Sequence, residues 1–389
     1  MKFRRKGMVL RLGVFLFLLG PKIPLLQAQL STSDHLADPG FWPTKDGEAR
    51  SDYVGPSVCA SCHEAKAASQ KTTPMAQSLH AASESEVLHA HPGMNFSVRK
   101  YKYKIETSTK GSLYQVTDGT DTLKASLIWA FGTGKVGQSY IFKKPDGNFY
   151  EARVTYFETL HNLDFTPTRA LENPRNLKEA MDRQVGSDEI GRCFACHTTA
   201  ANVAGKLDEE KAVPGITCEA CHGGGAKHVA AAEAAQMAGL PEEARGTIFN
   251  PAQLMAIDSV DFCGACHGTF WDVKLSGAKG VATVKAQPYR LESSKCFRKP
   301  GNLITCVACH DPHEILQTKP SAYDGACLKC HGAEKPADVK NMVDHTRTCP
   351  VSSSKCVTCH MPKVYVPEMH YSFTDHRIRI VRSGEAYPE

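Results

Sequence analysis

The sequence repeats one short pattern of thiol and imidazole side chains seven times. Two thiols separated by two residues can each add to one vinyl group of the same porphyrin, and the adjacent imidazole then lies under the iron as an axial ligand. The pattern therefore predicts seven covalently bound haem c groups, each with its iron. Its members are Cys59, Cys62 and His63; Cys193, Cys196 and His197; Cys218, Cys221 and His222; Cys263, Cys266 and His267; Cys306, Cys309 and His310; Cys327, Cys330 and His331; and Cys356, Cys359 and His360.

Other uses of paired cysteines fit the repeat less well. Disulfide bonding does not require a histidine after every second cysteine. Structural zinc takes two cysteine pairs, or one cysteine pair with a distant histidine pair, and seven pairs is an odd number. A thioredoxin-like pair occurs once, beside a βαβ pattern, which this chain lacks. Haem attachment remains the favoured interpretation.

The haems are expected to dominate the fold. After a cleavable leader the chain offers only about 52 residues for each haem, so the porphyrins must supply most of the buried apolar surface. We expect a mainly α fold with little regular structure, wrapped around stacked haems as in multihaem cytochromes, with a small antiparallel β insert. Such a fold should be lost if haem insertion fails.

The uneven spacing of the motifs predicts the domain organisation. Residues 1–28 read as a signal peptide, residues 29–90 as a linker with the first haem segment, residues 91–167 as a β-rich insert, and residues 168–389 as a six-haem domain. In the insert, Phe96 to Ile105 has β-forming residues with partial period two, and Pro145-Asp146-Gly147 predicts a hairpin turn. Helices are expected at Ala60 to Leu79, Pro174 to Val185 and Ala226 to Ala238.

The N-terminus and the charge balance bear on location and partners. A basic start, an apolar run from Met8 to Leu19 and a small residue at Ala28 indicate a cleaved signal peptide and a periplasmic or otherwise exported protein, with no membrane span in the mature chain. Six of the 46 Lys and Arg residues lie in this leader. The mature chain with its haem propionates should therefore be acidic, which disfavours nucleic acid and favours a small basic redox partner.

Several segments resemble bacterial multihaem cytochromes. They are Ser78-Leu79-His80-Ala81, Gly215 to Gly223 with His228, Cys306 to His313, Cys356 to Pro362 and the ending His370 to Arg377. The broader superfamily includes the tetrahaem nitrifier cytochrome, pentahaem nitrite reductase and octahaem hydroxylamine oxidoreductase. The resemblance implies second axial ligands at tail and spacer histidines: His80, His228, His313, His345, His370 and His376, with His91 as the seventh and His161 in reserve. His35 and His89 are left as surface residues.

Two cysteines, Cys296 and Cys349, lie outside the motifs, each just upstream of one. In an oxidising compartment the simplest interpretation is a disulfide between them. A thiolate ligand or a reactive thiol is the alternative.

Three functions remain open. The favoured one is an electron carrier whose mostly bis-histidine haems perform no substrate chemistry, exchanging electrons with quinol-linked proteins or other cytochromes. The second is an oxidoreductase acting on a small nitrogen or sulfur compound at one open haem. No Cys-x-x-Cys-Lys motif of the nitrite reductase type occurs, and the octahaem enzymes have one more attachment site. A third is a subunit of a larger redox complex that completes the haem chain.

Overall fold

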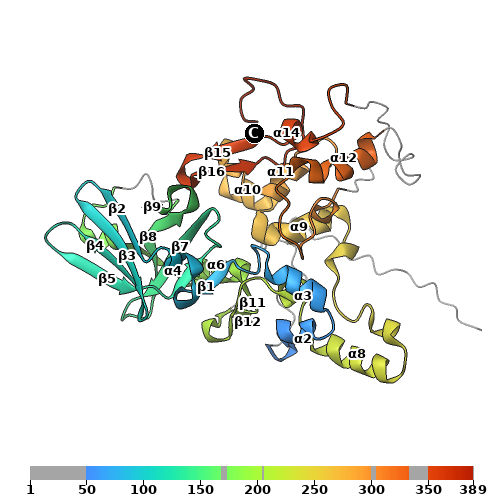
Figure 1. Cartoon of the computed structure of the whole chain (residues 1–389), viewed down its shortest axis with the longest axis horizontal. Coiled ribbons are helices and arrows are strands. Elements are labelled where there is room, and N and C mark those ends of the chain that lie inside the picture. Colours follow the sequence, from blue (N-terminus) through green and yellow to red (C-terminus); the bar gives the residue numbers. More distant parts are fainter. Residues whose placement is uncertain (1–49, 168–172, 204–205, 299–303, 333–348, 389) are drawn as a thin grey trace, which may run out of the picture.

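The computed structural model describes residues 50–167, 173–203, 206–298, 304–332 and 349–388 (Figure 1). The predicted signal peptide, His35 and His345 lie outside these residues. Within them, 39% of the residues are helical and 23% are in strands. The prediction of a mainly α fold with a small β insert is therefore wrong. The chain is mixed α/β, with a substantial antiparallel β region in its N-terminal half, on the left of Figure 1.

Two antiparallel sheets make up this region. The first has the order β1 (Leu79–Ala81), β6 (Trp129–Phe131), β7 (Gly137–Lys143), β8 (Phe149–Phe157), β10 (Asp182–Val185), and β9 (Asn162–Phe165) also pairs with β8. The second has the order β2 (Gly93–Val98), β3 (Tyr101–Ser108), β4 (Gly111–Thr117), β5 (Thr122–Ser126). The predicted hairpin around Asp146 is confirmed as β7 and β8.

Two local features explain why the β region exceeds the predicted insert. The segment from Phe96 to Ile105 is not one strand, because the chain reverses at Arg99, whose φ is 53°, and β2 pairs back onto β3. The first sheet also takes its edge strands, β1 and β10, from outside residues 91–167. The predicted helix from Pro174 to Val185 is short, α5 (Leu177–Met181), and its last residues form β10 instead.

The main core lies within the β region. Buried tyrosine and phenylalanine side chains fill it, among them Tyr103, Tyr114, Tyr140 and Phe142. On β3 buried and exposed residues alternate along most of the strand, as a strand with one solvent face requires. Helix α4 (Glu86–Ala90) adds the buried Leu88 to this core.

A second core joins the β region to the first motif-bearing helix of the C-terminal half. Helix α6 (Ser187–His197) contributes Ile190 and Phe194, which pack with Leu79, Ile141 and Val185. Phe194 is fully buried and meets Trp129 and Phe131 edge-on. The sheet therefore fixes the position of α6 and of the motif at its end.

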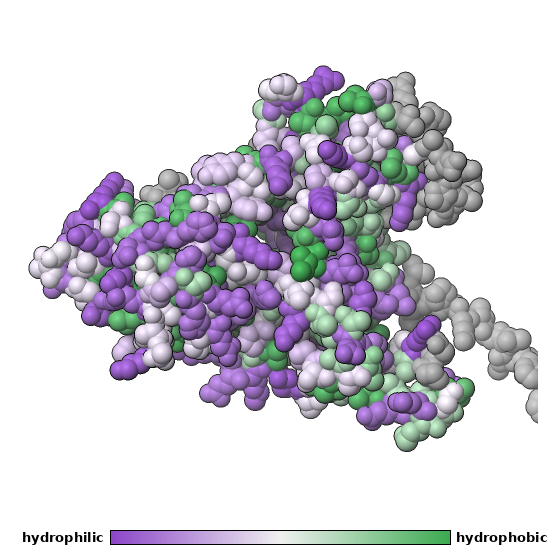
Figure 2. Space-filling view, in the orientation of Figure 1, coloured by the Kyte–Doolittle hydropathy of each residue, from purple (hydrophilic) through white to green (hydrophobic). Residues whose placement is uncertain are grey.

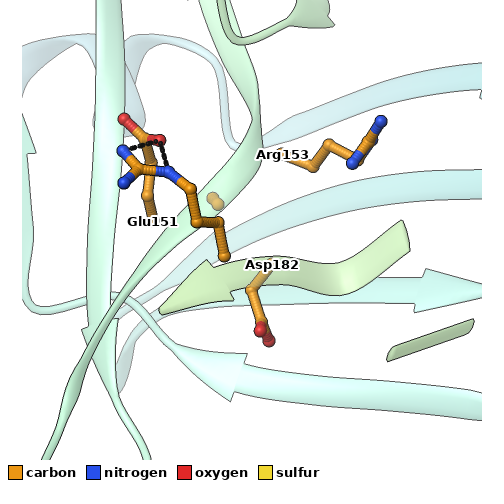
Figure 3. A pocket seen from close by; sticks show the side chains of 5 residues that line it. Glu151, Arg153 and Asp182 are labelled. Atoms are coloured by element: carbon orange, nitrogen blue, oxygen red, sulfur yellow. Dashed lines mark hydrogen bonds and ion pairs between the residues drawn. The ribbon is translucent and has the colours of Figure 1, made fainter. Parts of the chain in front are cut away.

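An ion-pair network supports the same junction. Arg183 of β10 donates hydrogen bonds to Glu151 of the neighbouring strand β8, and Figure 3 labels Glu151 at one end of the dashed lines. The Nη1 of Arg183 also pairs with Glu189 in α6, at 2.5 Å. One half-buried arginine thus connects two strands with the helix that carries Cys193, Cys196 and His197.

Short helices carry the remaining motifs. Helices α6, α7 (Cys218–His222), α9 (Ala256–His267), α12 (Asp324–His331) and α14 (Cys356–His360) all end at a motif histidine. Besides α4 and α5, the described residues also form the helices α2 (Pro56–Ala60), α3 (Glu64–Lys71), α8 (Ala226–Met237), α10 (Phe270–Ser276) and α11 (Gln287–Glu292). Helix α8 confirms the prediction for Ala226 to Ala238, whereas Ala60 to Leu79 is helical only in part.

Turns and small strand pairs complete the described chain. The strand pairs are β11 (Thr198–Thr199) with β14 (Val213–Pro214), β12 (Asn202–Val203) with β13 (Lys206–Leu207), and β15 (Lys363–Val366) with β16 (Tyr371–Thr374). The 3₁₀ turns are Arg50–Asp52, Ala82–Glu84, Glu158–Leu160, Glu209–Lys211, Pro241–Ala244, Pro251–Gln253, Gly280–Thr283, Cys306–Ala308, Pro320–Tyr323 and Pro367–Met369.

The C-terminal hairpin β15–β16 returns to the β region, as Figure 1 shows. At its turn His370 contacts Asp164 of β9 through Nε2, at 2.9 Å, and its ring meets Phe157 edge-on. Hydrophilic residues cover much of the face of the β region seen in Figure 2. Among the residues that the structure describes, no helix is long and apolar enough to cross a membrane.

Candidate haem-binding sites

The cysteines of different motifs meet in pairs. Cys59 of the first motif and Cys218 of the third lie close enough for each thiol to shift the pKa of the other. The fourth motif approaches two others in the same way, through Cys266 with Cys196 and through Cys263 with Cys306. The sixth and seventh motifs meet at Cys327 and Cys356.

Two further pairs of neighbouring cysteines link the motifs into one series. Cys221 of the third motif lies near enough to Cys263 of the fourth to act electrostatically on its thiol. Cys309 of the fifth motif acts in the same way on Cys327 of the sixth. Motifs one, three, four, five, six and seven therefore follow one another in space, and motif two adjoins motif four.

Three motif histidines face a second imidazole from elsewhere in the chain. His63 faces His228 of α8, with ring centres 6.3 Å apart and planes 17° apart. His222 faces His313 at 6.1 Å and 12°, and His310 faces His376 at 6.3 Å and 40°. An imidazole nitrogen lies about 1.1 Å from its ring centre and about 2.0 Å from a bound metal, so two rings on opposite sides of one metal ion sit about 6.2 Å apart. The spacing fits an iron between each pair.

On several motif histidines and on the histidines that face them, the hydrogen-bonded nitrogen is Nδ1, which leaves Nε2 available. The Nδ1 atoms of His197, His222 and His360 contact the backbone oxygens of Ser78, Phe249 and Arg379 at 2.9–3.0 Å. Among the facing histidines, Nδ1 of His228 contacts Thr247 Oγ1, that of His313 contacts Asp311 Oδ1, and that of His376 contacts Thr374 O. A partner on Nδ1 fixes the tautomer and ring orientation of a metal-bound histidine. These rings are thus prepared to coordinate through Nε2.

Burial favours the neutral imidazole that binds metal. Loss of solvent lowers the pKa of His197, His222, His267 and His310. It lowers the pKa of His376 to about 4. At neutral pH these rings hold no extra proton that iron would have to displace.

Other histidines proposed as second ligands are placed differently. The Nε2 atom of His91 contacts the hydroxyl of Tyr156, and that of His370 contacts Asp164. The rings of His91 and His161 lie 6.4 Å apart, but neither belongs to a motif, and the His161 side chain is 71% exposed. His80 lies on β1 opposite Ala130. The Nε2 of His89, predicted to be a surface residue, contacts Ser83 O.

The remaining two cysteines are both free. Cys296 is half-buried and lies near Cys330 of the sixth motif, whereas Cys349 is exposed. The structure therefore does not contain the expected disulfide. Among the described residues, no group of three or more His, Cys, Asp or Glu side chains is arranged to hold a bare metal ion.

Three charged groups near the motifs, two of them buried and one half-buried, are not marked by any pattern in the sequence. Arg290 and Asp375 are both fully buried and form an ion pair at 2.9 Å. Burial alone would raise the pKa of Asp375, but hydrogen bonds from Arg290 hold it below its usual value. Burial and then the charge of Asp261 raise the pKa of Glu292 to about 8, and Glu292 Oε1 has no hydrogen-bond partner. The only sequence signal was the position of Asp375 directly before His376.

Two comparisons relate the chain to known cytochromes. Residues 153–223, which include the second and third motifs, match the family model described as cytochrome c554 and c-prime. Because this match includes Cys193 to His197 and Cys218 to His222, it supports covalent haem attachment at these two motifs. No curated protein matches the chain in sequence. It is distantly similar to the crystal structure of outer cell wall cytochrome OcwA, with 15% identity, a TM-score of 0.46, and coverage of 85% of this chain and 80% of the other.

Proposed function

We propose that this protein is an exported heptahaem electron carrier whose haems are mostly bound by two histidines. Each of the seven motifs would hold one haem c through its two cysteines, with the motif histidine as the first axial ligand. The haem supplies an iron that alternates between ferric and ferrous states. The polypeptide holds the irons in a fixed order and keeps substrates from binding to them.

The contacts between motif cysteines carry this proposal. A thioether would anchor one edge of a porphyrin at each cysteine, so haems whose cysteines lie close enough to shift each other's pKa must approach one another closely. Electron tunnelling falls steeply with distance, and it is fast only between such neighbours. The series from motif one through three, four, five and six to seven would give a continuous route, with motif two as a branch at motif four.

At three of the seven motifs, axial ligation supports a carrier over a catalyst. We assign His228, His313 and His376 as the second ligands at motifs one, three and five, because their rings face the motif histidines with Nδ1 already engaged. An iron with two imidazole ligands is saturated and changes oxidation state with little rearrangement. Such ligation also lacks the methionine that raises the potential, so low potentials follow.

The partners follow from charge and location. The leader points to export to the periplasm or beyond, where the acidic mature chain would attract small basic redox proteins by electrostatic steering. Quinol-linked proteins or other cytochromes are suitable donors and acceptors. The β region would serve as a docking face if the protein is a subunit of a larger redox complex.

Three measurements on the purified holoprotein test this function. The mass of the mature chain should include seven haems, and a reductive titration should take up seven electrons per chain. Nitrite, hydroxylamine and sulfite should not be turned over by the reduced or oxidised protein. Steady turnover of any of these compounds would favour the oxidoreductase alternative, and a mass without the macrocycles would refute haem attachment itself.

A further inference from the structure

The segment from Thr374 to Arg379 touches the imidazoles of two motifs. His376 in its middle faces His310 of the fifth motif at 6.3 Å. At its end, the Arg379 backbone oxygen lies 2.9 Å from Nδ1 of His360 in the seventh motif, and its backbone N–H donates to His360 O at 3.2 Å. Whatever fixes this segment therefore fixes ring positions at two haem sites.

A buried ion-pair cluster fixes it. Arg290 of α11 donates Nε and Nη2 to the two carboxylate oxygens of Asp375, at 2.9 and 3.0 Å, and both side chains are fully buried. Arg379 Nη1 donates to Asp375 Oδ2 at 2.6 Å. The carboxylate also accepts the backbone N–H of Arg377 at 3.0 Å. A two-point fork of this kind fixes orientation as well as distance.

Helix α11 holds the segment at further points. Ser294, just after the helix, accepts the Ile378 backbone N–H at 2.8 Å and donates to His376 O at 3.4 Å. The Nη1 atom of Arg290 donates to Pro388 O, and the Tyr387 ring lies 4.6 Å from the guanidinium. The chain on both sides of His376 is thus held from α11 and from the C-terminal end.

Placing two charges in the interior, with a third partly buried beside them, requires a reason beyond stability. Buried ion pairs gain little over apolar packing because both charges lose their water. An axial ligand, however, must be held to within about half an ångström, and a supporting shell of hydrogen bonds is the usual means. Asp375 immediately precedes His376, so the fork acts on the backbone from which that imidazole projects.

We propose that Arg290, Asp375 and Arg379 form a positioning cluster that holds His376 over the iron of the fifth motif. Through the Arg379 backbone, the same cluster sets the ring orientation of His360 at the seventh. Two haems would therefore share one buried support. This inference rests on the assignment of His376 as an axial ligand, and its test separates the two statements.

The test compares His376→Gly with Asp375→Asn in the oxidised holoprotein. Spin states are measured by EPR and absorption, with and without added imidazole. His376→Gly should convert about one haem in seven to high spin, and imidazole should restore it. Asp375→Asn, which keeps the shape of the side chain, should produce high-spin iron at the same haem, also restored by imidazole, and should shift the low-spin signal of one further haem.

Asp182→Asn is the matched control, because Asp182 is a nearly buried carboxylate paired with Lys144 in the β region. It should leave every haem low-spin even if it lowers the melting temperature. If His376→Gly has a high-spin haem but the Asp375→Asn spectrum is like that of the control, the positioning role of the cluster is overturned and the ligand assignment stands. No high-spin iron in His376→Gly would overturn the ligand assignment and this inference together.

Arg290→Lys provides a second variant if Asp375→Asn yields no holoprotein. Lysine keeps the positive charge but loses the two-point fork. It should give the same high-spin signal at smaller amplitude. A fully low-spin spectrum in that variant would contradict the proposal.

Discussion

Replacing His313 with glycine should open one iron while leaving its covalent attachment intact. His313 faces His222 with the closest and most nearly parallel rings of the three pairs, at 6.1 Å and 12°. Cys218 and Cys221 would still hold the porphyrin, and His222 keeps its hydrogen bond to Phe249 O. The variant therefore removes one nitrogen ligand and leaves a space the size of an imidazole.

The size of the effect follows from the number of motifs. One haem in seven, about 14% of the total, should become high-spin in the ferric state and bind carbon monoxide in the ferrous state. The potential of that haem should rise, by about 120 mV for each hundredfold preference of ferric over ferrous iron for the lost imidazole. Added imidazole should reverse both changes.

EPR with spin quantification and a potentiometric titration are the assays. His89→Gly is the control, since Nε2 of His89 contacts Ser83 O and its side chain is exposed. The control should behave as the parent protein does. A His313→Gly protein that stays wholly low-spin would refute the bis-histidine geometry deduced from the facing rings.

Three further predictions concern other parts of the molecule. Glu292, whose pKa is raised to about 8, should hold its proton more firmly when a nearby haem iron is reduced. The reduction potential of that haem should therefore fall by up to about 59 mV per pH unit between roughly pH 7 and 9. Voltammetry of Glu292→Gln should show no such slope. Because this raised pKa exceeds the unfolded value, its contribution to stability is full below about pH 4.5 and is lost as pH rises through 8, which a denaturant series in parent and variant would reveal. Phe194→Ala should lower the free energy of unfolding by about 3–5 kcal/mol, because the side chain is fully buried between the sheet and α6, and a smaller loss than 1 kcal/mol would contradict that packing. His370→Ala should leave all haems low-spin, since the His370 Nε2 contacts Asp164 rather than a motif, and a new high-spin signal would restore His370 as a ligand.

The motifs could be predicted from the sequence because their chemistry is local. Attachment requires two thiols and an imidazole at fixed spacing along the chain. In five of the motifs this short segment lies at the end of a helix, which ends at the histidine. The proposed second ligands are a different problem. His228 follows its partner His63 by well over a hundred residues, and only the fold decides that it faces His63 rather than the nearer His222.

The β region was underestimated because its strands are marked weakly. β5 reads Thr-Leu-Lys-Ala-Ser and is exposed along most of its length, so no alternation of apolar residues identifies it. The short β1 and β10 gain their hydrogen bonds only from neighbours across the sheet. The turn at Arg99 required a left-handed residue that is not glycine, which sequence patterns rarely reveal.

Spin quantification of the fully oxidised parent protein tests the central claim most directly. An electron carrier with saturated irons should show low-spin ferric haem only, accounting for all the iron in the sample. A high-spin signal amounting to one haem in seven would place an open iron in the resting protein. That result would contradict a pure carrier and support an oxidoreductase.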